Sequence, residues 1–285
     1  MKKYNENSML FKALHTPSLV VGCIMLSVIV GAMIFQPLLT SYDGNANDYA
    51  AMLLPPSAEH WLGTDGFGRD LFTRILEGGK VSLMIGVEVL FTTTIFGTCI
   101  ALIGGYYEKV DIVVMRVMDV IMAFPQLLVA MVLAAVFGNN IGGVTLALTI
   151  VYTPRTVRML RSSILTAKEE VYVEAAQAIG VKPTKIMFKH ILPAALPTLI
   201  VQETFLFASS ILAEAGISFV GCGVTPPDPS WGNILSDATT LFRKAPWNVY
   251  APGVAIIITV MSLQLIGDGL REVLDPKRSK GKARG

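Results

Sequence analysis

The feature that most constrains the fold is a series of long apolar stretches that contain almost no charged residues. Each stretch is about as long as a helix must be, at about 1.5 Å per residue, to cross a hydrocarbon layer of roughly 30 Å. The composition agrees, because 15% of the 285 residues are charged, whereas soluble domains carry roughly a quarter. The sequence therefore predicts an all-α, polytopic membrane protein.

We expect six membrane-spanning helices. The predicted spans are residues 18–36, 81–103, 117–137, 141–158, 198–220 and 251–268. The first follows a basic leader, but it is too long for a secretory signal and lacks a small-residue cleavage site before Pro37, so we expect it to stay uncleaved. The fourth is the weakest, because Pro154, Arg155 and Arg158 intrude on its end.

The distribution of basic residues predicts the orientation. If both termini are cytoplasmic, the outer side holds few of the 23 Lys and Arg residues, namely Arg69, Arg74, Lys80, Arg243 and Lys244. This asymmetry agrees with the excess of positive charge found in cytoplasmic loops. Omitting the fourth span would move every basic residue between positions 155 and 189 to the outside, so we retain six spans.

This topology divides the chain into a cytoplasmic arm, a transmembrane domain and a basic cytoplasmic tail near the anionic inner leaflet. Their boundaries are residues 1–17, 18–270 and 271–285. Within the transmembrane domain we expect an outer segment, a large cytoplasmic loop between the fourth and fifth spans, and an outer loop. These lie at residues 37–80, 159–197 and 221–250.

The cytoplasmic loop has the pattern of two short helices. Thr166 and Glu169 form a capping box that predicts the start of the first helix, and Gly180 predicts its end. Pro183 suits the first turn of the second helix. We expect that helix to stop at two prolines, Pro193 and Pro197.

The first of these helices is suited to contact with another surface. Its alanines allow a close approach, and Glu174 adds a charge at its edge. Docking into a groove of a partner protein is one interpretation. An amphipathic helix lying on the membrane surface is the other, and the residues alone leave both open.

This loop resembles the EAA signature of permease subunits of bacterial ATP-binding-cassette importers. The resemblance rests on Glu174-Ala175-Ala176, on Gly180 and on Leu192-Pro193. His190 stands where the signature usually has isoleucine, and His190-Ile191-Leu192-Pro193 is similar to the peptide/nickel/opine subgroup. The resemblance implies that the loop is a coupling helix, seated in a cleft of a separate ATPase subunit.

Three other segments extend the resemblance over almost the whole chain. The outer segment from His60 to Asp70 resembles that of C-type permeases of peptide systems, as do residues 218–232 and the C-terminal stretch from Gly267 to Pro276. Cys222 replaces the leucine that is usual in that subgroup, and we expect this change to be harmless because both side chains are apolar.

The resemblance implies a permease subunit of a binding-protein-dependent importer in the bacterial plasma (inner) membrane. It implies a heterodimer with a homologous permease, two ATPase subunits that hold ATP and Mg, and an extracytoplasmic solute-binding protein. It favours di-/oligopeptides as cargo, with nickel or a metal chelate as the alternative in the same family.

The chain itself is expected to lack catalytic chemistry. A phosphate-binding loop is missing, because Gly79-Lys80 is followed by Val81 and Arg74 occupies the place of the first glycine. The three histidines and three cysteines are widely spaced and suggest neither a metal site nor a disulfide framework. The net charge of +2 gives no indication of nucleic-acid binding. We therefore expect no cofactor in this chain and ATP hydrolysis only in partner subunits.

Three glutamates in the predicted spans are candidates for lining a transport pathway, since a charge inside a bilayer is costly unless it faces protein or water. They are Glu88, Glu203 and Glu214, of which the last two share a face of the fifth span. Pairing with Ser, Thr or Arg on neighbouring helices is the alternative. The same glutamates could serve a proton-coupled secondary transporter, and a scaffold protein without a pathway would not need them for uptake.

Overall fold

The computed structural model describes residues 9–274, and the side chains of residues 12–274. Within this range the chain is helical, with no β-strand, which confirms the predicted all-α class. The first eight residues of the predicted arm and residues 275–285 of the predicted basic tail lie outside the described residues, as does the Asp275-Pro276 pair.

Twelve α-helices occur in the described part of the chain, with three short helical segments of other kinds. In order they are α1 (Met9–Leu14), α2 (Pro17–Ile34), α3 (Gln36–Leu39), η1 (Tyr49–Ala51), α4 (Leu71–Tyr106), α5 (Glu108–Met122), α6 (Gln126–Phe137), α7 (Ile141–Lys168), α8 (Val171–Ala178), α9 (Pro183–Ile186), the π-helical η2 (Met187–Ile191), α10 (Leu192–Phe219), α11 (Trp231–Ala238), η3 (Thr239–Leu241) and α12 (Trp247–Leu274).

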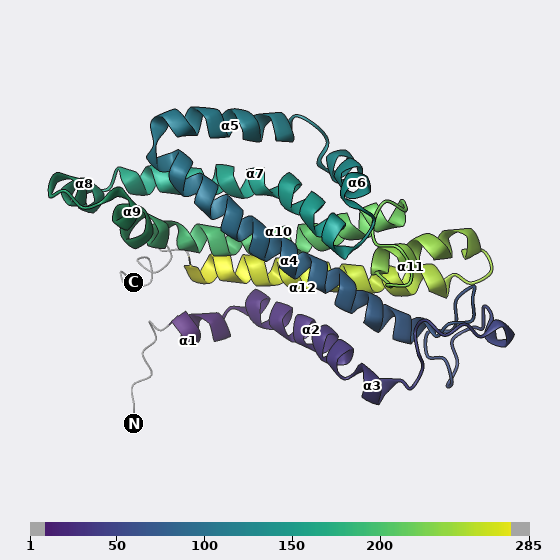
Figure 1. The fold of residues 1–285 in the computed structure, drawn as a ribbon. Helices are drawn as coiled ribbons and strands as arrows, with labels where there is room; N and C mark the ends of the chain where they lie inside the picture. The colour runs from purple at the N-terminus through teal and green to yellow at the C-terminus, as the bar shows by residue number, and fades with distance from the viewer. Residues whose placement is uncertain (1–8, 275–285) are drawn as a thin grey trace, which may run out of the picture.

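The long helices α2, α4, α7, α10 and α12 run side by side as an elongated bundle (Figure 1). Helix α4 packs on α7 and α10, and α12 lies between α2 and α10. Close helix approach is possible at Gly22 of α2, where an added Cβ would lie 2.7 Å from the carbonyl oxygen of Ser262. Three buried apolar clusters form the core of the bundle.

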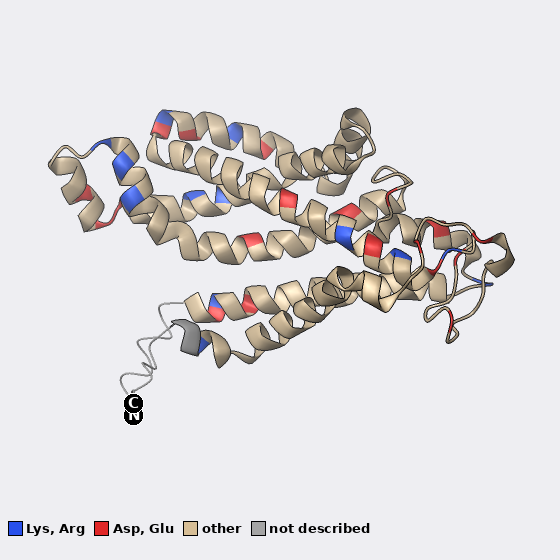
Figure 2. Cartoon of the chain, turned by 60° about the horizontal axis from the view of Figure 1, so that its bottom comes forward, with Lys and Arg blue, Asp and Glu red and all other residues tan. Residues whose placement is uncertain are grey.

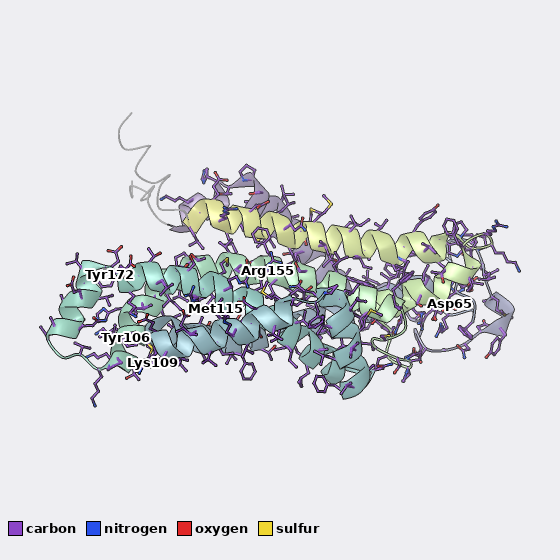
Figure 3. All side chains as sticks on the ribbon, turned by 90° about the horizontal axis from the view of Figure 1, so that it is seen from above. Asp65, Tyr106, Lys109, Met115, Arg155 and Tyr172 are labelled. Atoms are coloured by element: carbon purple, nitrogen blue, oxygen red, sulfur yellow. The ribbon has the colours of Figure 1, made fainter. Side chains whose placement is uncertain are left out.

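The irregular and short elements lie at the two ends of this bundle. Helices α8 and α9 lie at one end, whereas α11 and the segment between α3 and α4 lie at the other (Figure 1). Tyr172 of α8 and Asp65 of the outer segment are accordingly labelled at opposite ends of the molecule in Figure 3. The fold thus separates the predicted cytoplasmic loop from the predicted outer segments.

Four helices of the described chain are long and apolar enough to cross a membrane: α2, α4, the continuous run Pro183–Phe219, and α12. The pair α5 and α6 makes a fifth if it is one bent span. Helix α7 is long enough but ends in a basic stretch that includes Arg155, Arg158 and Arg161. In Figure 2 the basic residues of α5, α7 and the α8–α9 loop lie in the half of the molecule that holds α8. The count of six spans stays a prediction.

The prediction of one helix over residues 117–137 is wrong. Helix α5 ends at Met122 and α6 begins at Gln126, and their axes differ by 91°. Pro125 explains the break, because it has no backbone N–H and disfavours a helical conformation at the preceding residue.

The second span is longer than predicted, because α4 begins at Leu71 rather than near residue 81. Asp70 caps this helix, since its Oδ2 accepts a hydrogen bond of 2.8 Å from the backbone N–H of Thr73. A helix of this length measures about 54 Å. It extends well beyond the hydrocarbon layer and shortens the outer segment accordingly.

Candidate coupling loop and transmembrane polar sites

Helix α8 of the predicted cytoplasmic loop does not begin as expected. Helix α7 continues to Lys168, and Thr166 Oγ1 lies inside it, where it donates to the carbonyl oxygen of Ser162 at 3.1 Å. The predicted capping box of Thr166 and Glu169 is therefore wrong. Helix α8 starts after Glu170, whose side chain makes no capping hydrogen bond.

The end of α8 is as predicted. Gly180 has a φ of 78°, a conformation that glycine adopts without steric cost. Its N–H donates to Gln177 O at 3.0 Å, and the N–H of Val181 donates to Ala176 O at 3.1 Å. These bonds satisfy carbonyl groups at the end of the helix.

The second loop helix starts at Pro183 as predicted, but it does not end at the two prolines. It continues through the π-helical segment η2 into α10, so that Pro193 lies in the first turn of α10 and Pro197 inside it. The wider π turn shifts the hydrogen-bond register just before Pro193, with Leu192 N donating to Met187 O. The loop is therefore joined to α10 without a break.

The predicted coupling residues face different ways. Ala176 is buried and packs toward the bundle, whereas Glu174, Ala175, Gly180 and Pro193 are exposed and Leu192 is half-buried. Exposed apolar side chains accompany them. We call Val171, Tyr172, Ile179 and Phe188 the apolar loop surface; Ile179 is 80% and Val171 77% exposed.

The inner face of the loop is held by the bundle. Val173 and Ala176 belong to the same buried cluster as Leu102 of α4, Ile164 of α7 and Leu199 of α10. Lys168 Nζ also donates to the carbonyl oxygen of Tyr106 at 2.9 Å. The loop therefore shares one buried core with three long helices.

Glu203 of α10 lies buried between α4 and α7 and is 5% exposed. Thr156 Oγ1 donates to its Oε1 at 2.7 Å, and Thr93 Oγ1 donates to its Oε2 at 3.1 Å. The hydroxyl pairing considered as an alternative is therefore present at this carboxyl group.

Glu214 of α10 is fully buried. It accepts hydrogen bonds of 2.8 Å from Ser82 of α4 and from Ser218 of its own helix. Ser82 in turn accepts from the N–H of Trp231, and Ser218 accepts from the N–H of Val224. Glu214 thus links two long helices to the outer loop.

Glu88 is half-buried and lies apart from the other two glutamates, at the contact of α4 and α7. Thr145 Oγ1 donates to its Oε2 at 2.8 Å. Thr145 also lines a groove of about 510 Å³ between α4, α5 and α7. This groove is not predicted from the sequence, although threonines recur every fourth residue along α7, at Thr145, Thr149 and Thr153.

Asp65 organises the outer segment. Its Oδ1 accepts from the backbone N–H groups of Phe67 and Arg69, and its Oδ2 lies 2.6 Å from Arg69 Nε and 3.5 Å from Arg74 Nε. Asp237 of α11 lies 3.6 Å from Arg69. Burial raises the pKa of the Asp237 carboxyl group, and the two arginines oppose this shift.

Further contacts fasten the same segment to the long helices. His60 Nδ1 lies 2.9 Å from Asp70 Oδ1, the residue that caps α4. The carbonyl oxygen of Thr64 accepts from Trp247 Nε1 at 3.3 Å and from Asn248 Nδ2 at 3.2 Å, both on α12. The stretch from His60 to Asp70 therefore builds a closed cap over the ends of α4 and α12.

Nothing in the described residues resembles a metal centre, since no three His, Cys, Asp or Glu side chains gather there. The three cysteines are free, and Cys23 and Cys99 are exposed. The polar groups of these sites therefore offer hydrogen bonds, charge and contact surface.

The fold and these sites define a polytopic helical membrane protein with a projecting loop at one end and a closed polar cap at the other. Residues 95–280 match the family described as "Binding-protein-dependent transport system inner membrane component". The chain belongs to this family, whose members are the permease components of ATP-binding-cassette transport systems.

Relatives match almost the full length of the chain. It is 42% identical over 269 residues to the dipeptide transport system permease protein DppC of Alkalihalophilus pseudofirmus, covering 94% of this chain and 88% of that protein. It is 35% identical over 276 residues to the probable D,D-dipeptide transport system permease protein DdpC of Escherichia coli, covering 96% and 93%. It is 37% identical over 269 residues to the glutathione transport system permease protein GsiD of Escherichia coli, covering 94% and 88%.

Proposed function

We propose that this chain is the permease subunit of an ATP-driven, binding-protein-dependent importer of di-/oligopeptides. The names of the relatives support the cargo, since they describe transport of dipeptides, D,D-dipeptides and glutathione. Nickel or a metal chelate is the second candidate, because the motifs of the subgroup serve both kinds of cargo. A proton-coupled carrier and a scaffold protein are less well supported, because neither requires a docking loop.

The observation that carries the proposal is the apolar loop surface. Exposed apolar side chains outside a lipid-facing region mark contact sites for other proteins. Helix α8 lies beyond the end of the long helices, away from the sides of the bundle that lipid would cover (Figure 1). This position favours docking to an ATPase subunit over lying on the membrane surface. Glu174, Ala175, Ala176, Gly180, Leu192 and Pro193 couple that subunit to the bundle.

In this assembly the chain pairs with a homologous permease, and two ATPase subunits bind the coupling loops of the two permeases. ATP and Mg are held by those subunits, and this chain performs no catalysis. Both termini face the cytoplasm of a bacterial cell, and a solute-binding protein delivers the peptide to the cap at the opposite end. The continuity of the loop with α10 supports this coupling, because movement of the loop must shift that helix.

Restoration of uptake tests the cargo. Cells that lack the chain are supplied with a labelled dipeptide, a longer labelled peptide and radioactive nickel, with and without its expression. Peptide uptake that returns on expression supports the proposal and brackets the length of the cargo. Restored nickel uptake with unchanged peptide uptake would show that the cargo is nickel or a metal chelate instead of a peptide.

A Gly180→Val variant tests the coupling loop. Valine is strained at a φ of 78°, although nothing lies within 4 Å of its Cβ, so the bundle should still insert while the end of α8 changes direction. We expect loss of peptide uptake and of co-purifying ATPase. Gly221→Val is the matched control, since Gly221 has a φ of 85°, equally open space and a place in the outer loop. Normal uptake in the Gly180→Val variant would refute the coupling assignment.

A further inference from the structure

A groove lies between α4, α5 and α7, away from the polar cap. It measures about 510 Å³, within the range of small-molecule sites, roughly 300–1,000 Å³. Its lining includes Thr92, Phe96, Met118, Leu146, Thr149 and Thr153. Phe96 and Leu146 are more than one-third exposed, so the groove opens at the surface of the bundle.

Glu88 stands at the edge of this groove. Its Oε2 accepts from Thr145 Oγ1 at 2.8 Å, and Thr145 lines the groove. One turn further along α4, Thr92 Oγ1 donates to the carbonyl oxygen of Glu88 at 2.7 Å and lies 2.6 Å from Thr149 Oγ1. The carboxyl group therefore continues a row of hydroxyl groups along a wall that is otherwise apolar.

The carboxyl group of Glu88 lacks a positive partner in the described part of the chain. No Lys, Arg or His lies within ion-pair distance of it there, and its one hydrogen-bond donor is a neutral hydroxyl group. Glu203 and Glu214 also bind hydroxyl groups, but both are buried and closed to a ligand. Glu88 is half-buried midway along α4, where an uncompensated charge is costly unless it faces water or a cation.

We propose that this groove is a peptide subsite, in which Glu88 binds the N-terminal ammonium group of a transported peptide. The charges are complementary, and an ammonium–carboxylate hydrogen bond is stronger than a neutral one. The apolar wall formed by Phe96, Met118 and Leu146 accommodates the first side chain. This inference rests on the proposed function and specifies how the chain would contact its cargo.

The test is uptake of a labelled dipeptide by the complete transporter carrying a Glu88→Gln variant. Glutamine still accepts a hydrogen bond from Thr145, so a merely structural role predicts normal uptake. The subsite predicts at least a tenfold loss of uptake at limiting peptide concentration, about 1.4 kcal/mol. Glu77→Gln is the matched control, since Glu77 lies three turns earlier on α4, accepts a hydrogen bond from Gln36 at 3.0 Å and is remote from the groove.

A second measurement tests the peptide subsite if the Glu88→Gln variant fails to assemble. A Leu146→Cys variant in which Cys23, Cys99 and Cys222 are replaced by alanine is labelled with a maleimide during turnover, with and without saturating dipeptide. Protection by the dipeptide is expected. Equal labelling, or a cross-link from this cysteine to the partner permease, would overturn the subsite and assign the groove to helix packing.

These results also separate the two proposals. A wild-type chain that restores no peptide uptake contradicts the proposed function. A wild-type chain that restores uptake, together with an equally active Glu88→Gln variant, leaves the importer in place and refutes the subsite alone.

Discussion

The two ends of the molecule are attached to the long helices by different kinds of contact. At the loop end, α8 is attached through the buried apolar side chains of Val173 and Ala176, and it leaves other apolar side chains exposed. At the cap end, the outer segment is attached through charged and polar groups, centred on Asp65 and Asp70, that satisfy one another internally.

This difference indicates how each end meets a partner. The charged groups of the cap pair with one another within the chain, so a partner can contact it and leave without exposing unpaired charges. The loop exposes an apolar surface to water, which costs roughly 25 cal/mol of free energy for each Å² of apolar area. The cap end also exposes large apolar side chains, including Trp61 at 55% and Phe67 at 47%. Both ends therefore offer apolar contact surface, and a partner of the cap also meets its internally paired charges.

The largest effect is expected from removing the charge at the centre of the cap. Asp65→Ala leaves Arg69 and Arg74 without their buried partner, and loss of one member of such a group costs roughly 3–5 kcal/mol. The outer segment should open and be cleaved by protease added from outside. Asp237→Ala is the control, because its side chain is half-exposed and the cost should stay below about 1 kcal/mol.

A smaller effect is expected from alanine at Gly68 of the cap and Gly180 of the loop, two of the glycines with positive φ. In Gly68→Ala the new Cβ would lie 1.7 Å from the carbonyl oxygen of Asp48. The backbone must therefore shift, in addition to the cost of holding alanine at a positive φ. In Gly180→Ala only the strain of roughly 1–2 kcal/mol applies. The melting temperature of the Gly68→Ala variant should be clearly lower than that of the Gly180→Ala variant. Equal melting temperatures would contradict the distinction between a closed cap and an open loop.

A specific loss of binding is expected at the apolar loop surface. Ile179→Asp places a charge where an apolar contact is proposed, and central contacts of this kind contribute roughly 2 kcal/mol, about 30-fold in affinity. Because Ile179 is exposed, the stability of the chain should change by less than about 0.5 kcal/mol. Co-purification with the ATPase measures the first effect and thermal unfolding the second. Unchanged co-purification would remove Ile179 from the contact.

The smallest effect is expected at an ion pair on the side of the bundle. Arg158 Nη2 lies 2.6 Å from Asp119 Oδ1, and both side chains are about half-exposed. Exposed pairs contribute roughly 0.2–1 kcal/mol, so Arg158→Ala should barely change the melting temperature or peptide uptake. A large loss of uptake at constant stability would place Arg158 in the coupling mechanism instead.

The sequence was sufficient for the helical class, for the end of α8 at Gly180 and for the start of α9 at Pro183, since each depends on local backbone preferences. It failed where tertiary packing decides. Thr166 and Glu169 suit a helix start, but burial of Ile164 and Ala167 in the core carries α7 through Thr166 to its end at Lys168. Pro193 and Pro197 suit a helix end, but the π segment before them allows the helix to continue.

In the candidate sites, too, some features can be predicted from the sequence and others depend on tertiary packing. The glutamates could be identified from the cost of burying charge, but nothing in the sequence distinguishes the buried Glu203 and Glu214 from the half-buried Glu88. That difference depends on which hydroxyl groups of α4 and α7 face each carboxyl group, and on the break at Pro125 that positions α5 beside the groove.

The unbroken run Pro183–Phe219 makes one rod of the loop and the fifth long helix. Its 37 residues measure about 55 Å. A tilt of about 5° would displace one end by about 5 Å relative to the other, so in the proposed assembly a small rotation at the loop would move the opposite end of α10 sideways by that amount. Such leverage requires stiffness, and the π segment and Pro197 are the places where the rod would bend first. The stiffness of the helix at these two places would set how much of a movement of the loop reaches the far end of α10.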